Sequence, residues 1–233
     1  MSRTDDGPPP PPRRSEIRSS CVDGTRTLIN AIHKLDTRPR VFLGGSAVGI
    51  YGDQGAAELD ETSSPGTGFL ADVCREWERE SAAAQAMGIR TVLLRTGIVL
   101  HPRGGALAKL QPLFACGLGG SLGEGKHWQS WIGMDDWLRA CRHAIECEEL
   151  RGPLNLVAPE VVPQREFEQT LGRVMGRPTV LPTPKAAIQL LFGQMADEVL
   201  LASTRATPSV LPKTGYEFLH PSLENALRHV LGK

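Results

Sequence analysis

The sequence predicts an α/β protein in which helices cover a parallel sheet and a smaller, mostly helical lobe follows. Two short apolar segments, 40–44 and 89–95, are typical of strands, and an amphipathic helix is expected over 69–87 between them. Apolar residues lie side by side in the second segment, as expected for a parallel strand that is buried on both faces. A strand, a helix and a strand in this order form a βαβ unit, whose crossover is right-handed.

Further elements extend this pattern in both directions. Apolar residues recur at near-helical spacing from Ile17 to Leu35 and predict an amphipathic helix. Residues 46–68 are rich in Gly, Asp, Ser and Pro and predict a long loop, of a length that is usually functional within a compact domain. Later segments predict helices over 106–116 and 135–146, a strand over 154–157, and helices over 164–175, 185–192, 197–203 and 223–231.

The chain changes character near residue 160, because prolines separate short helical pieces beyond that point. We therefore expect three regions. An extended, proline-rich tail covers 1–12, a sheet domain covers 13–160, and a small helical domain covers 161–233.

The composition is that of an ordinary globular protein, with 40% hydrophobic and 22% charged residues. Lysine plus arginine equals aspartate plus glutamate, 26 each, so the sequence lacks the basic excess typical of nucleic-acid and membrane binding. No apolar run approaches the ~20 residues of a membrane helix, and we expect a cytoplasmic protein with no nucleic-acid or membrane partner. The five cysteines are scattered without a C-x-x-C pair, which predicts free thiols and no metal site.

A motif at the end of the first strand connects the sequence to a known family. Residues 44–53 read G-G-S-A-V-G-I-Y-G-D. This stretch resembles the strand end of extended short-chain dehydrogenase/reductases, where an active-site serine precedes a Tyr-Gly-Asp turn. Further segments resemble an atypical, epimerase-like branch of that family, in order and at proper spacing: 69–78, 94–100, 104–109, 119–136, and a tail over 155–231 similar to the branch's small C-terminal domain.

The resemblance covers roughly residue 13 to the end of the chain and implies an NAD(P)-binding, Rossmann-type fold. Members of that family begin with a strand and a G-x-x-G-x-x-G loop, whose backbone amides approach the pyrophosphate of the cofactor. The sequence contains no such loop. The expected fold is therefore a partial Rossmann-type, doubly wound parallel α/β sheet whose first βαβ half is missing, as in a fragment or a mispredicted start.

Two further departures concern the reaction itself. The family's Tyr-x-x-x-Lys dyad, in which the lysine lowers the pKa of the tyrosine for proton transfer, is replaced by Phe69 and Val73. Neither side chain can move a proton, a lack that the atypical branch shares. In the first helix Glu16 matches a family position that faces the cofactor, but Cys21 stands where an arginine is expected.

The resemblance assigns the remaining site residues, each beside a structural alternative. Ser46 and Tyr51 are the candidate catalytic residues, although a strand-end serine and a packed turn aromatic would give the same pattern. Glu16, Ser46, Arg95 and Gly97 are the candidate cofactor-binding residues. A solvated helix face would also explain Glu16, and a structural ion pair would explain Arg95. Arg95 ends a buried strand at its carboxyl end, where open α/β sheets bind ligands.

Two other groups of polar residues leave alternatives open. Asp135 and Asp136 are either an acid/base pair or residues of a helix start, where the helix dipole favours carboxylates. Gly133 replaces a histidine that often precedes this pair in the family. Lys109 and Lys126 either contact a phosphate or are ordinary exposed lysines.

The leading hypothesis is an NAD(P)-dependent epimerase or reductase that acts on a small polar substrate. Nucleotide sugars are one such class, and NADP or NAD would be the cofactor. A cofactor-sensing or partner-binding protein without catalysis is the first alternative, and a truncated, inactive fragment is another. An α/β-hydrolase ranks last, because residues 44–48 do not form the G-x-S-x-G motif.

All of these hypotheses depend on one arrangement of strands. The apolar segments around residues 42 and 92 should lie side by side and point the same way, so that Ser46 and Arg95 emerge together at one edge of the sheet. The strand over 41–43 would then form an open, apolar edge, which favours self-association.

Overall fold

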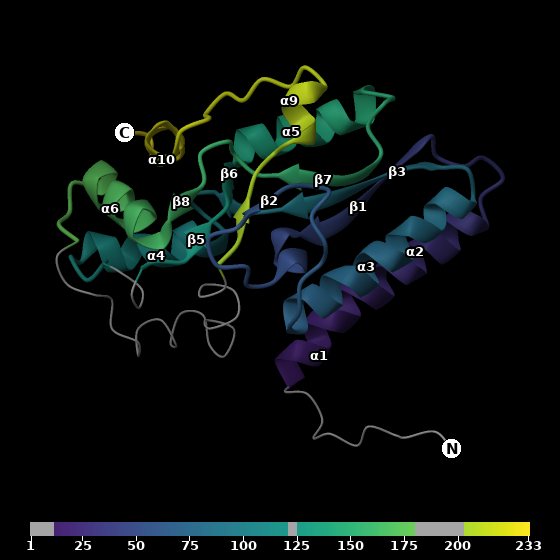
Figure 1. Ribbon diagram of the computed structural model, residues 1–233, viewed down its shortest axis with the longest axis horizontal. Helices are drawn as coiled ribbons and strands as arrows, with labels where there is room; N and C mark the ends of the chain where they lie inside the picture. The colour runs from purple at the N-terminus through teal and green to yellow at the C-terminus, as the bar shows by residue number, and fades with distance from the viewer. Residues whose placement is uncertain (1–11, 121–124, 180–202) are drawn as a thin grey trace.

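A three-stranded parallel sheet with the order β1-β3-β7 forms the centre of the protein (Figure 1). The structure is a computed structural model that describes residues 12–120, 125–179 and 203–233. β1 and β3 pair in parallel register with Ser46 opposite Arg95, so the expected arrangement of these strands is confirmed. The three strands β1, β3 and β7 span Val41–Ala47, Arg90–Thr96 and Gly152–Leu156.

Helices cover both faces of this sheet, as expected for a doubly wound arrangement (Figure 1). α3 (Phe69–Ala86) connects β1 to β3, and α2 (Gly24–His33) packs beside it on the same face. α5 (Met134–Glu146) covers the opposite face. The buried contacts are Ile29, Ile32 and Ala84 around Phe42 on one face, and Ala140 and Ala144 around Val92 and Leu94 on the other.

The amphipathic helix expected over 17–35 is present, and it begins before the residues whose periodicity predicts it. α1 (Pro12–Arg18) leads through a π-helical turn, η1 (Ser19–Asp23), into α2. Because a π turn widens the helical repeat by one residue, the apolar positions on its two sides do not follow a single 3.6-residue period. Val22, inside the turn, is buried, and the turn packs against α3.

A second core lies beyond the carboxyl end of β3. Three helices, α4 (Gly105–Ala115), α6 (Gln164–Met175) and α10 (Leu223–Leu231), pack around the fully buried Trp131. α6 and α10 form the helical lobe that the sequence predicts, whereas α4 precedes the expected boundary near residue 160 and still packs with them. Two short parallel strands that the sequence did not predict, β4 (Ile98–Leu100) and β6 (Trp131–Gly133), belong to this region.

The segment 46–68 contains more structure than the expected long loop. A 3-10 turn, η2 (Val48–Tyr51), follows β1 and buries Ile50. β2 (Glu58–Leu59) pairs in parallel with β9 (Arg205–Ala206), so the C-terminal part of the chain returns to the sheet and holds the segment. The remaining described elements are β5 (Trp128–Gln129), which pairs antiparallel with β8 (Val162–Pro163), and the short helix α9 (Val210–Lys213).

Some expectations fall on parts of the chain that the structure does not describe. The helix expected over 185–192 lies outside the described residues. Of the helix expected over 197–203, only Ser203 is described, and it is not helical. Of the tail over 1–12, only Pro12 is described. Among the helices of the described ranges, none combines the length and the apolar character that a membrane span requires.

β1 pairs only with β3 among the described strands, so its other side is an edge of the sheet. Unpaired backbone groups on such an edge are a template for pairing with another chain. We expect the protein to self-associate as its concentration rises, as measured by sedimentation velocity, and Val41→Lys to reduce the association by placing a charge on the edge. A monomer that is independent of concentration would contradict this expectation.

Gly45 in β1 provides a test of how tightly α3 packs on the sheet. A Cβ atom at this position would lie 2.3 Å from the ring of Trp77, which is closer than real contacts allow. Gly45→Ala should therefore lower the free energy of unfolding by about 1–3 kcal/mol, the usual effect of overpacking. Urea denaturation would measure the change.

Gly24 is the matched control for this substitution. It has helical φ and ψ of −60° and −47°, and a Cβ there would meet nothing within 4 Å. Gly24→Ala should leave stability unchanged or raise it by about 0.4–1 kcal/mol, because alanine reduces the entropy of the unfolded chain. Equal effects at the two positions would show that Trp77 moves away without cost.

Candidate functional site

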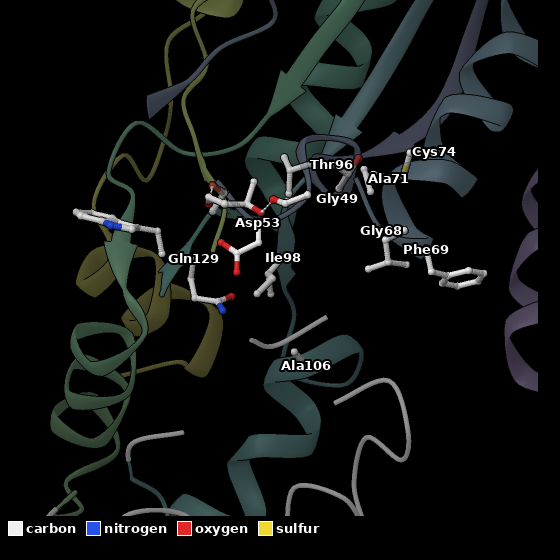
Figure 2. Close-up of a pocket in the computed structure, with 18 of the residues that line it drawn as sticks. Gly49, Asp53, Gly68, Phe69, Ala71, Cys74, Thr96, Ile98, Ala106 and Gln129 are labelled. Atoms are coloured by element: carbon white, nitrogen blue, oxygen red, sulfur yellow. Dashed lines mark hydrogen bonds between the residues drawn. The ribbon is translucent and has the colours of Figure 1, made fainter. Parts of the chain in front are cut away.

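A cavity of about 740 Å³ opens where β1 and β3 end (Figure 2). Its walls include the turn after β1, Thr96 at the end of β3, Gly97 directly after it, and the start of α3. The start of α4 and residues 128–130 close the other side, so the cavity lies between the two cores. Ligands of open α/β sheets bind outside the carboxyl ends of the strands, and the volume is in the usual range for ligand pockets.

Two helices begin at this cavity. α3 follows Gly68, whose φ of 107° favours glycine, and α4 begins at Gly105. Phe69 and Ala106, in the first turns of the two helices, line the cavity (Figure 2). Neither helix start is capped by a side chain within the described part of the chain. The open N–H groups and the positive ends of the helix dipoles make such starts favourable for anionic groups.

Gly97 allows three pieces of chain to approach closely beside the cavity. A Cβ atom on Gly97 would lie 2.6 Å from the carbonyl oxygen of Ser130 and 2.9 Å from Cγ1 of Val157. Its backbone N–H donates to the carbonyl of Leu156 over 3.1 Å. Any larger residue would have to displace the backbone of the opposite wall, so the shape of the cavity depends on glycine here.

The cavity offers few groups for proton transfer. Of the described lining residues, only Asp53 and Cys74 have titratable side chains. Burial raises the pKa of the Cys74 thiol to about 11, so the thiol stays protonated at neutral pH. Asp53 is exposed, and its carboxylate accepts a hydrogen bond from the N–H of Gly55 over 3.0 Å. Asp53 is therefore the one carboxylic acid among the described lining residues.

A buried ion pair joins α3 to the sheet next to the cavity. Arg95 donates from Nε to Oε1 of Glu78 over 2.8 Å and from Nη2 to Oε2 over 3.0 Å, which is the bidentate geometry of strong arginine–carboxylate pairs. Ser46 donates its hydroxyl hydrogen to the same Oε1 over 2.6 Å. Burial alone would lower the pKa of Arg95, but the hydrogen bonds to Glu78 and Tyr51 outweigh it and hold the pKa above its ordinary value.

Tyr51 extends this network to the third strand. Its hydroxyl oxygen accepts a hydrogen bond from Nη1 of Arg95 over 3.0 Å. The hydroxyl hydrogen has two acceptors within reach, the carbonyl of Asp60 at 2.9 Å and Oδ1 of Asn155 at 2.8 Å. Tyr51 is fully buried, and this burial raises its pKa. The residue therefore stays neutral at physiological pH and is closed off from solvent.

Glu61 completes the network on the side of the C-terminal segment. Its carboxylate accepts hydrogen bonds from the backbone N–H of Asn155 over 3.1 Å, of Ser209 over 3.1 Å and of Val210 over 3.3 Å. Nδ2 of Asn155 donates to the carbonyl of Thr207 over 2.9 Å. The polar chain thus runs from α3 through the sheet to residues 207–210.

Comparison with known proteins identifies the family. The chain is 42% identical over 214 residues to "Epimerase family protein Mb2239" of Mycobacterium bovis, an alignment that covers 92% of this chain and 70% of the relative. It is 34% identical over 221 residues to "Epimerase family protein SDR39U1" of Homo sapiens, covering 94% and 74%. The chain belongs to this epimerase family. The resemblance to the epimerase-like, atypical short-chain dehydrogenase/reductases is thereby confirmed.

Solved structures agree with this membership. The crystal structure of human epimerase family protein SDR39U1 (isoform 2) with NADPH matches with a TM-score of 0.86 at 31% identity, over 94% of this chain and 75% of that chain. A nucleoside-diphosphate sugar epimerase from Corynebacterium glutamicum matches with a TM-score of 0.78 at 32% identity, over all of this chain and 45% of that chain. A family model described as a domain of unknown function (DUF1731) matches residues 183–230.

The structure places the predicted site residues of this epimerase-family chain in three different settings. Gly97 lines the cavity. Ser46, Arg95 and Tyr51 come together, but in the buried network beside the cavity and not on its wall. Glu16 is exposed on α1 and is not among the residues that line the cavity. The catalytic roles of Ser46 and Tyr51 and the cofactor contacts of Glu16, Ser46, Arg95 and Gly97 stay predictions.

The residues for which the sequence left two interpretations open also lie in different surroundings. Asp136 is buried, and its carboxylate accepts hydrogen bonds from the hydroxyl of Tyr216 and from the backbone N–H of Leu219 and His220, so it anchors the C-terminal segment. Lys109 and Lys126 do not line the cavity. Sequence reasoning missed Thr96, Asp53, Gln129 and Glu78. Thr96 could have been predicted, since it lies between Arg95 and Gly97, two predicted site residues at the end of a strand.

Substitution of Glu78 tests the buried ion pair. Glu78→Gln leaves the Arg95 guanidinium buried without its counter-charge, and loss of one partner of a buried pair costs about 3–5 kcal/mol of folding free energy. Chemical denaturation would measure the loss. Glu76→Gln, on the same helix, is the control because its partner Arg18 is 59% exposed, and exposed pairs contribute about 0–1 kcal/mol. Equal effects of the two substitutions would contradict a special role for Glu78.

Proposed function

We propose that this epimerase-family chain binds a nicotinamide cofactor, NADP or NAD, and acts as an epimerase or reductase on a small polar substrate, with nucleotide sugars as the leading class. The observation that carries the proposal is the cavity between the two cores, with two uncapped helix starts and Gly97 on its walls. The human relative that matches over 94% of this chain was solved with NADPH, which supports the choice of cofactor.

The walls of the cavity suit different parts of such ligands. The starts of α3 and α4, at Phe69 and Ala106, suit the phosphates of a dinucleotide or a nucleotide sugar. Thr96 and Gln129 supply polar side chains for ribose or sugar hydroxyls, and the predominantly apolar residues around them exclude water. When the cofactor is bound it supplies the hydride chemistry, and the protein orients it and the substrate.

In this proposal the buried network positions the wall and takes no direct part in proton transfer. Ser46 donates its hydrogen to Glu78, and Tyr51 is fully buried. Their neighbours Ala47 and Thr96 line the cavity, so the network fixes the ends of β1 and β3. Asp53 is the group that stands at the cavity with a carboxylate able to move a proton.

The chemistry of the lining also supports a second function, a protein that binds the cofactor without turnover. Phe69 begins α3 at the cavity, and Val73 is buried one turn further, so the two positions of the family's proton-transferring dyad hold apolar side chains. The cytoplasmic location and the absence of nucleic-acid and membrane partners stay predictions from the sequence.

Calorimetric titration with NADPH and NADH tests the proposal. Ala106→Trp places a large side chain at the start of α4 inside the cavity and should weaken binding at least tenfold, which corresponds to about 1.4 kcal/mol. Ala83→Trp is the control because Ala83 is exposed on α3 and does not line the cavity. If neither cofactor binds, or if Ala106→Trp binds as the unaltered chain does, the proposal fails.

A panel of nucleotide sugars with the bound cofactor separates the two functions. Turnover that is lost in Asp53→Asn while cofactor affinity is kept would support the enzyme. Tight cofactor binding without turnover of any member of the panel would support the second function.

A further inference from the structure

Three potential metal ligands meet at a place that the proposed cavity does not include. Asp135 stands in the first turn of α5, His220 precedes α10, and His229 lies in the last turn of α10. One ligand atom of each residue lies within 4.8 Å of those of the other two. Nε2 of His229 is 2.6 Å from Oδ2 of Asp135, and the rings of His220 and His229 are stacked with centroids 4.2 Å apart.

The backbone around these three residues is anchored by two carboxylates, those of the buried Asp136 and of the exposed Glu160. Asp136, next to Asp135, accepts the N–H of His220 on Oδ2 over 2.9 Å and that of Leu219 on Oδ1 over 2.8 Å. The start of α10 is held by a hydrogen bond from the N–H of Leu223 to the carboxylate of Glu160. Hydrogen bonds therefore hold the backbone segments that bring the three side chains together.

We propose that Asp135, His220 and His229 bind a divalent transition-metal ion of the Zn²⁺ class. Two imidazoles and one carboxylate are a ligand set that such ions accept, with bonds of about 2.0–2.2 Å. Tetrahedral coordination at that bond length needs ligand atoms about 3.3 Å apart, a value that lies between the 2.6 Å that separates Asp135 from His229 and the upper bound of 4.8 Å within the cluster. The side chains of Asp135 and His229 are 51% and 49% exposed, so water completes the coordination.

The ion pair between Asp135 and His229 by itself explains less of this arrangement. Exposed pairs contribute little to stability, and such a pair gives no role to the stacked ring of His220. A bound ion would use all three residues and would link the start of α5, which covers the sheet, to α10 in the second core. The site is independent of the function proposed for the cavity.

The experiment uses the chain free of any affinity tag and titrates it with Zn²⁺ in a calorimeter and with Co²⁺ by visible absorption. We expect one saturable site, with a Co²⁺ spectrum of nitrogen and oxygen ligands and no sulfur charge-transfer bands. His220→Gln and His229→Gln should each weaken binding at least tenfold. Zn²⁺ should raise the melting temperature of the unaltered chain and not that of the double variant H220Q/H229Q.

His33→Gln is the matched control, since His33 is exposed in α2 and lies outside the three-residue cluster. It should bind Zn²⁺ as the unaltered chain does, and circular dichroism would show that every variant is folded. The proposal is overturned if the double variant binds Zn²⁺ unchanged, if sulfur bands show that cysteines hold the ion, or if the chain shows no saturable binding.

Discussion

The pairing of Glu78 with Arg95 is the interaction on which the geometry of the site depends. One carboxylate from α3 holds the guanidinium of β3 through two hydrogen bonds and the hydroxyl of Ser46 in β1 through a third. Removing two charges from water costs several kcal/mol each, and only a well-satisfied geometry offsets that cost. Here the guanidinium also donates to Tyr51. The relative positions of a helix, two strands and the turn after β1 are therefore set together.

The same network reaches far along the sequence. Tyr51 contacts Asn155 at the end of β7, and Glu61 gathers backbone N–H groups from Asn155 and from residues 209 and 210. Polar groups buried at the carboxyl end of a parallel sheet need partners, and these come from the loop after β1 and from the returning C-terminal segment. The loop over 46–68 is ordered for this reason, although its composition resembles that of a free loop.

The sequence predicted the parts of the fold that follow from local periodicity. The buried strand around Val92, the helices over 164–175 and 223–231 and the pairing of Ser46 with Arg95 all agree with the structure. Residues whose role depends on distant partners were not predictable. Glu78 lies in a charged stretch of α3 and resembles any exposed helix residue until Arg95 is placed beside it. The two strands β4 and β6 have three residues each, and some 30 residues of chain separate them.

For the site residues too, local motifs were predictable from the sequence and contacts between distant residues were not. The motif over 44–53 located the correct end of the sheet. Ala47, Gly49 and Asp53 of this motif line the cavity, whereas Ser46 and Tyr51 lie in the buried network beside it. The cluster of Asp135, His220 and His229 joins residues up to 94 positions apart, a distance over which spacing in the sequence carries no signal.

The position of the cavity between two separately packed cores has a dynamic consequence. The chain passes from one core to the other at Gly97, where β3 ends and β4 begins, and the close contacts of Gly97 with Ser130 and Val157 hold the two walls together. A ligand that touches both walls adds contacts across this junction that exist only in the bound state. Binding would therefore favour the one relative position of the walls that makes all of these contacts.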